Sequence, residues 1–271
     1  MKLQALTLSA ILAASLAACN SKPQTAPQSD LTFEHLKSRV AYTLQGSASA
    51  FACDSDLTFG SSVDLLLPTA IYNHDITTLH DSILTLAFDT VGTDYPAIVS
   101  HYEKASVEQV GFKYNPIKVD TVAPFLANLD GYTQVQGNIA NLTPRILSYQ
   151  LILSEYPMHA AHGDYTIRYI NYDMQQGRVI ALEDLFTPEG IKALPKLLKD
   201  RARTVVSVIG PTAVTQMPAA NNYFINNQGN IEFAYQPYEI ASYAQGAVQL
   251  KIAPYLVTEY LTPYAKSLLL E

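Results

Sequence analysis

The chain has 271 residues, of which 48% are hydrophobic and 15% are charged, with 17 Lys and Arg against 24 Asp and Glu. Its length can bury one large core or two modest ones, and its apolar fraction excludes a largely disordered chain. The net charge of −7 argues against sequence-independent binding of nucleic acid, so no nucleic-acid partner is expected.

Residues 1–18 have the features of a signal peptide. Lys2 and the free amino terminus supply a positive charge, and an apolar stretch runs from Leu6 to Leu16 before two small residues, Ala17 and Ala18. About a dozen apolar residues are too few to span a hydrocarbon core about 30 Å thick, so cleavage is expected rather than a retained helix.

Cys19 directly follows this leader. The run Leu16-Ala17-Ala18-Cys19 resembles the lipobox of bacterial lipoproteins, in which the cysteine receives a diacylglycerol and becomes the new amino terminus. The alternative is an ordinary secretory signal with a chance cysteine. We expect lipidation of Cys19, the lipid bilayer as a partner, and a location in the cell envelope, at the outer membrane or facing the periplasm. The polar, proline-punctuated residues 19–30 are expected to be a tether.

Residues 31–130 are expected to form a companion α+β domain. Apolar and polar residues alternate in several runs of residues 31–70, which is typical of strands. Apolar residues at helical spacing then predict a helix that begins at Asn73 or Asp75 and ends at about Asp89. Two more helices are predicted, over residues 96–109 and 119–128.

From residue 131 the pattern changes to strands joined by tight turns. Four strands are predicted, over residues 134–139, 145–153, 165–169 and 179–182. A turn at Gly177 separates the last two, because glycine tolerates positive φ. The elements expected next are a helix starting at Thr187, a hairpin of residues 223–235, a strand over residues 247–252 and a short helix from Pro254. Hairpins and separate helices without regular β-α-β alternation indicate an α+β fold with mostly antiparallel sheets.

Two ordered motifs in this region resemble the RsiV-like domain of unknown function. The first lies between Glu155 and Phe186 and contains Ala160-Ala161-His162-Gly163, Asn171-Tyr172-Asp173 and Leu182-Glu183-Asp184-Leu185-Phe186. The second is Pro237-Tyr238-Glu239-Ile240-Ala241-Ser242-Tyr243-Ala244-Gln245-Gly246. Ala160-Ala161 stand where the family frequently has Gly-Gly.

That family occurs in the extracellular part of a lysozyme-sensing anti-sigma factor, where it binds lysozyme, and beside the catalytic domain of some peptidoglycan deacetylases. The resemblance implies that residues 131–271 form an RsiV-like α+β domain without accepted catalytic activity. Nothing in the chain resembles the deacetylase catalytic domain, and the chain has no Gly-x-Ser-x-Gly pattern.

Tyrosine is abundant, with 18 residues, whereas tryptophan is absent. Its ring offers an apolar face and its hydroxyl a polar handle, which suits both sheet cores and recognition surfaces. One interpretation places the tyrosines in the sheet core. The other places four residues on one ligand-binding surface: Tyr156, His162, Tyr238 and Tyr243.

His159 and His162 could share a metal ion, since imidazole suits zinc or copper. The alternative is that His162 bonds the backbone in a tight turn, and no third ligand follows at motif spacing. We therefore expect neither a metal nor a cofactor. Cys53 has no cysteine partner within the chain if Cys19 is acylated.

Together these observations predict a non-catalytic envelope lipoprotein that binds a lysozyme-like protein or a peptidoglycan fragment. An acidic surface would favour a cationic partner. Two alternatives stay open at this point: a peptidoglycan-modifying enzyme or its accessory factor, and a purely structural envelope protein.

Overall fold

The computed structural model describes residues 31–44, 57–109, 116–117, 131–157, 160–205, 217–218 and 221–270. Cys19, Cys53, His159, the leader, the tether and the helix predicted over residues 119–128 lie outside these ranges. No helix in the described ranges is both long enough and apolar enough to cross a bilayer.

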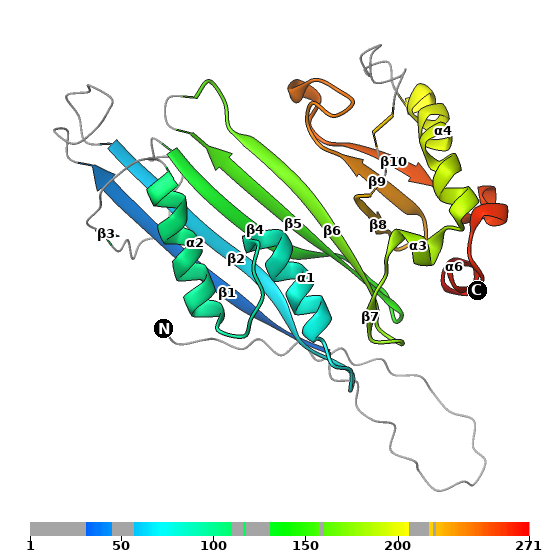
Figure 1. Cartoon of the computed structure of the whole chain (residues 1–271), viewed down its shortest axis with the longest axis horizontal. Helices are drawn as coiled ribbons and strands as arrows, with labels where there is room; N and C mark the ends of the chain where they lie inside the picture. The colour runs from blue at the N-terminus through cyan, green and yellow to red at the C-terminus, as the bar shows by residue number, and fades with distance from the viewer. Residues whose placement is uncertain are drawn as a thin grey trace, which may run out of the picture.

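The described residues form a seven-stranded sheet and a three-stranded sheet (Figure 1). The strands of the larger sheet are β1 (Leu31–Leu44), β2 (Leu57–Ile71), β3 (Pro116–Ile117), β4 (Gly131–Leu142), β5 (Ile146–Tyr156), β6 (Asp164–Asp173) and β7 (Arg178–Val179). Their order is β3-β1-β2-β4-β5-β6-β7, and among these described strands only the β2–β4 pair is parallel. The predicted mostly antiparallel α+β fold is confirmed.

Two helices lie between β2 and β4 in the chain and cover one face of the large sheet (Figure 1). They are α1 (Thr77–Phe88) and α2 (Tyr95–Gln109), close to the predicted bounds. Asp75 accepts hydrogen bonds from the backbone and the side chain of Thr77, at 2.9 and 2.6 Å, which explains the start of α1. Parallel strands need a long crossover, and these helices provide part of it.

The first hydrophobic core lies between these helices and the sheet. A domain boundary was predicted between residues 130 and 131, but this core contains buried residues from both sides of it. Leu65, Ile83, Val135, Tyr149 and Tyr172 belong to one cluster. Because β2 pairs with β4 across this boundary, the two predicted parts share one sheet and one core.

The three-stranded sheet packs with the remaining helices around a second core. It comprises β8 (Tyr223–Ile225), β9 (Ile231–Tyr235) and β10 (Val248–Ile252), in the order β10-β9-β8. The helices are α3 (Leu182–Leu185), α4 (Pro188–Val205) and α6 (Pro263–Leu269), with 3-10 turns η2 (Tyr243–Gln245), η3 (Pro254–Leu256) and η4 (Thr258–Tyr260). The buried side of α4 packs on this core through Leu194, Leu198 and Ala202.

The strand predicted over residues 179–182 ends at Val179, because Leu182–Leu185 forms α3. The Asp184 carboxylate accepts hydrogen bonds from the Ala181 backbone and the Arg178 guanidinium, both at 2.8 Å, and so stabilises the first turn of the helix. The turn at Gly177, with φ of +67°, is confirmed. The short helix predicted from Pro254 is a single 3-10 turn, and α6 follows it as a helix that was not predicted.

Asn171 joins the two sheets. Its side-chain amide donates to the carbonyl of Tyr223 at 2.9 Å, and its side-chain oxygen accepts from the Ile225 backbone at 3.0 Å and from the Ser148 hydroxyl at 2.7 Å. Buried amides that satisfy both partners in this way specify a unique docking of one sheet on the other.

Candidate functional site

Three of the four predicted surface residues meet where the loop after β9 passes the start of β6. The rings of His162 and Tyr243 are stacked with centroids 4.2 Å apart, and the Tyr238 and Tyr243 centroids are 5.6 Å apart. Tyr165 contacts the edge of this group, 6.4 Å from Tyr243. We call His162, Tyr165, Tyr238 and Tyr243 the aromatic cluster.

Backbone hydrogen bonds hold the aromatic cluster in place. The Tyr243 hydroxyl donates to the Gly163 carbonyl at 2.6 Å, and the Tyr165 hydroxyl accepts from the Ala247 backbone at 3.0 Å. Desolvation, followed by the negative charge of Asp164, raises the pKa of Tyr243, so its hydroxyl keeps the proton that it donates.

His162 bonds the backbone, as the non-metal interpretation of this residue predicted. Its Nδ1 lies 2.8 Å from the Gly163 carbonyl oxygen and therefore carries a hydrogen. In the neutral ring Nε2 is then an acceptor, and it lies 3.5 Å from the Tyr238 hydroxyl. Within the described residues, no three His, Cys, Asp or Glu side chains converge on a metal-sized site.

Tyr238 projects from the cluster into solvent and is 62% exposed. Its φ of +69° lies in the left-handed region, which is costly for a bulky residue. The turn is held on both sides, since the Gln236 backbone donates to the Glu239 carboxylate at 2.5 Å and Ile240 is buried. A strained, exposed ring adds little to the core, so packing does not account for its position.

Tyr156 lies beside the cluster and has a different role. It stacks on Tyr132, with centroids 5.9 Å apart, and its hydroxyl donates to the Ala160 carbonyl at 2.9 Å. Gly163 separates it from the cluster: a Cβ at this glycine would lie 2.8 Å from the Glu155 carbonyl oxygen and 3.4 Å from the Tyr156 ring. Tyr156 therefore supports the turn that carries His162.

The carboxylate of Asp164 borders the cluster. Glu155 and Asp164 are direct cross-strand partners in β5 and β6, and both are exposed. Like charges directly opposite each other destabilise an antiparallel pair, by roughly 0.2–1 kcal/mol. The negative charge of Asp164 acts on Tyr243, whereas that of Glu155 acts on Tyr102 of α2, outside the cluster.

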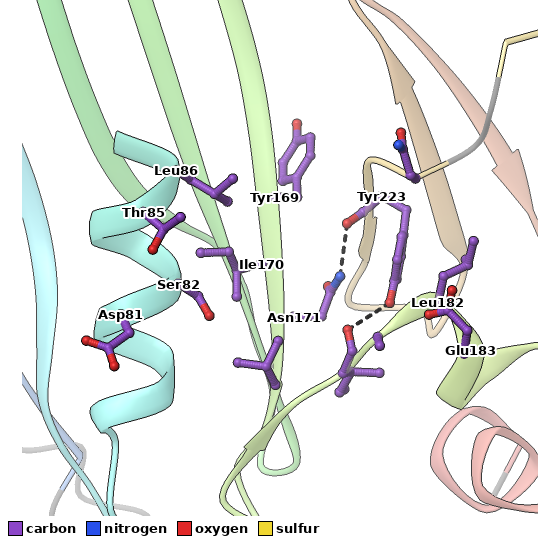
Figure 2. A pocket seen from close by; sticks show the side chains of 14 residues that line it. Asp81, Ser82, Thr85, Leu86, Tyr169, Ile170, Asn171, Leu182, Glu183 and Tyr223 are labelled. Atoms are coloured by element: carbon purple, nitrogen blue, oxygen red, sulfur yellow. Dashed lines mark hydrogen bonds between the residues drawn. The ribbon is translucent and has the colours of Figure 1, made fainter. Parts of the chain in front are cut away.

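A cleft of about 530 Å³ lies elsewhere, between α1, the end of β6 and residues 179–183 (Figure 2). Asp81 and Leu86 stand on its α1 side and Glu183 on the opposite side. The deeper polar groups bond to the protein itself: the Tyr223 hydroxyl donates to the Ile180 carbonyl at 2.9 Å, beside the Asn171–Tyr223 bond. This cleft lies where the two hydrophobic cores adjoin each other. Sequence reasoning missed it because its walls come from distant parts of the chain.

Comparisons with known proteins agree with this architecture. Residues 183–255, which include Tyr238 and Tyr243, match the family model described as "Protein of unknown function (DUF3298)". No match was found among curated proteins.

Two crystal structures share the fold. A member of the DUF3298 family from Bacteroides fragilis has 20% sequence identity and a TM-score of 0.65, and the match covers 87% of this chain and 95% of that chain. A DUF3298 family protein from Pseudomonas aeruginosa PAO1 has 17% identity and a TM-score of 0.59, with coverage of 87% and 96%. At these identities the similarity shows the fold alone.

Proposed function

We propose that this protein is a non-catalytic lipoprotein of the cell envelope that binds its ligand through the aromatic cluster. The observation that carries the proposal is Tyr238, which is 62% exposed and strained yet held against Tyr243 and His162. Exposed tyrosines on a rigid base are effective binding residues, because they bury a large area at a small cost in conformational entropy. The resemblance of the two motifs to the RsiV-like domain supports the same role.

The ligand that we favour is a cationic, lysozyme-like protein. The Asp164 carboxylate beside Tyr243 and the chain's net charge of −7 both complement a basic surface. A peptidoglycan fragment is the second candidate, since the exposed face of Tyr238 can stack on a sugar ring.

Two features support a binding role over an enzymatic one. The Tyr243 hydroxyl and His162 Nδ1 both donate to the Gly163 carbonyl, so the polar groups of the cluster serve to fix the turn. The contact between the Tyr238 hydroxyl and His162 Nε2 is 3.5 Å, longer than the separation of about 2.6–3.2 Å that proton transfer needs. The envelope location rests on the lipobox-like run that ends at Cys19.

The test measures binding of the mature protein to lysozymes and to purified muropeptides. Tyr238→Ala is expected to weaken binding by about tenfold or more, equivalent to 1.4 kcal/mol, at unchanged thermal stability. Val91→Ala is the control, because Val91 is an apolar side chain that is 58% exposed and lies between α1 and α2, outside the cluster. Tyr238→Ala binding at wild-type strength, or no binding of either ligand by the wild type, would overturn the proposal.

Two further measurements test the remaining parts. Turnover in muropeptide hydrolysis or deacetylation assays would contradict the non-catalytic role. Mass spectrometry is expected to find an acylated Cys19 at the amino terminus, and a free or uncleaved terminus would refute the anchor.

A further inference from the structure

The helix α4 carries an unusual share of the positive charge. Its 18 residues hold five of the chain's 17 Lys and Arg and two of its 24 acidic residues, a net charge of +3 in a chain of net charge −7. The side that carries Leu194, Leu198 and Ala202 is buried in the second core. The exposed basic residues of α4 are Lys192, Lys196, Arg201 and Arg203.

Beside α4, the turn η3 holds two apolar side chains out in solvent. Tyr255 is 71% exposed and Leu256 is 69% exposed, the largest values among the large hydrophobic side chains that the structure describes. The residues on either side, Pro254 and Val257, are buried. The Leu256 backbone donates to the Ala253 carbonyl at 3.0 Å, so the pair sits on a closed turn rather than a loose loop.

The two features meet in one hollow of about 670 Å³ between α4 and η3. Leu197 and Val257 line this hollow together with the exposed Tyr255 and Leu256. Two exposed cations, Arg201 and Lys251, also border it. Within the described part of the chain, neither cation forms an ion pair within 4.0 Å, although Glu232 is the cross-strand partner of Lys251. Asp200 also borders the hollow, and its carboxylate lies 3.5 Å from the Arg203 guanidinium.

Exposed Tyr and Leu side chains beside exposed cations are typical of surfaces that bind a membrane peripherally. Tyrosine favours the water–lipid interface, leucine favours the acyl region, and lysine and arginine attract anionic headgroups. A soluble polyanion would be complemented by the cations, but it offers no apolar layer for the two adjacent side chains. The combination therefore fits a lipid surface better than a charged polymer.

We propose that Arg201, Lys251, Tyr255 and Leu256, the docking face, rest on an anionic phospholipid surface. Leu256 and the Tyr255 ring enter the interface, while the two cations contact lipid phosphates. This inference rests on the proposed function for the anchor that keeps the body near a bilayer. A tethered body needs only weak additional affinity, because the tether raises its effective concentration at the surface. Docking would fix the orientation in which the aromatic cluster meets its ligand.

The experiment reports on the docking face and on the anchor separately. The mature protein carries Leu256→Cys in a Cys53→Ser background, and the new thiol bears an environment-sensitive fluorophore. It is mixed with vesicles of phosphatidylcholine alone or of equimolar phosphatidylcholine and phosphatidylglycerol. Flotation with the neutral vesicles measures the anchor, whereas the emission shift measures insertion of η3.

A blue shift is expected with the anionic vesicles only. It should disappear in about 1 M salt, where the Debye length is about 3 Å, and in the double variant Arg201→Glu with Lys251→Glu. A label at Val91→Cys, in the loop between α1 and α2, is the control: Val91 is 58% exposed and should show no shift. Thermal unfolding checks that each variant keeps its fold.

No shift, an equal shift with neutral vesicles, or a shift that survives charge reversal would overturn the docking face. The same shift with soluble polyglutamate in place of vesicles would also overturn it, by assigning the face to an acidic polymer. Loss of flotation with a preserved shift would refute the anchor alone.

Discussion

The side chain of Gln236 bonds both backbone groups of Ile167. Its oxygen accepts from the Ile167 N–H at 2.8 Å, and its amide donates to the Ile167 carbonyl at 2.6 Å. Asn222 bonds the same edge of β6: its side-chain oxygen accepts from the Tyr169 N–H at 3.1 Å, and its amide donates to the Ile167 carbonyl at 2.9 Å. These two amides take the place of a neighbouring strand on the outer edge of β6, and Gln236 thereby fixes the turn that carries Tyr238.

Replacing Gln236 with alanine should lower stability and binding together. The change leaves the Ile167 N–H without its partner, whereas the Ile167 carbonyl keeps the bond from the Asn222 amide. An unsatisfied group costs about 1–3 kcal/mol when it is buried. Because Ile167 is partly accessible to water, we expect a loss of about 1–2 kcal/mol in denaturant unfolding. Ligand binding should weaken as well, as the Tyr238 turn loosens. Asn226→Ala in the β8–β9 loop is a comparison in which binding should not change.

Tyr238→Asn should separate binding from stability. Asparagine adopts the left-handed region more easily than tyrosine, and the exposed Tyr238 ring contributes little buried area. The free energy of unfolding should therefore stay within about 1 kcal/mol of the wild type or rise. Ligand affinity should fall at least as far as in Tyr238→Ala. A loss of stability well above that range would show that the Tyr238 ring contributes to packing instead.

Gly163→Ala should disturb the aromatic cluster without touching any of its rings. The added Cβ would lie 2.8 Å from the Glu155 carbonyl oxygen, a backbone atom that cannot rotate away. We expect a cost of about 1–3 kcal/mol and altered Tyr ring signals in NMR spectra. Ala161→Ser, at an exposed neighbouring position, should leave both unchanged. An unperturbed Gly163→Ala protein would show that the turn is looser than its contacts indicate.

Two buried tyrosines should respond oppositely to loss of the hydroxyl. The Tyr149 hydroxyl is buried without a hydrogen-bond partner among the described residues, whereas the Tyr223 hydroxyl donates to the Ile180 carbonyl. Tyr149→Phe should be neutral or slightly stabilising, and Tyr223→Phe should cost about 1 kcal/mol. Thermal or denaturant unfolding of both variants measures the difference. A larger loss in Tyr149→Phe would reveal a partner, such as a buried water.

Stability should fall steeply in alkaline solution. Burial raises the pKa of Tyr149, Tyr223 and Tyr235 above the ordinary value of about 10. The folded state then keeps protons that the unfolded state releases, so stability is complete below about pH 10 and decreases as the pH rises further. Each tyrosine contributes a slope of up to about 1.4 kcal/mol per pH unit. Unfolding measured across this range should show a shallower slope in Tyr149→Phe than in the wild type, and equal slopes would contradict the assignment.

The local elements could largely be read from the sequence, because hydrophobic period and capping residues act over a few neighbouring positions. Apolar spacing located α1 and α2, and Asp75 marks the start of α1 through its bonds to Thr77. The sequence also grouped Tyr156, His162, Tyr238 and Tyr243 on one surface. The structure brings the rings of the last three together, whereas Tyr156 stacks on Tyr132.

The relations between elements depended on contacts that no local pattern encodes. The parallel pairing of β2 with β4, the amide bonds that seal β6 and the hollow between α4 and η3 each join segments that are far apart in the chain. Residues 179–182 form an apolar run compatible with a strand, yet a helix begins at Leu182, where the side chain of Asp184 bonds the Ala181 backbone and Arg178. Periodicity reports which residues prefer burial, and only tertiary packing decides which partner buries them.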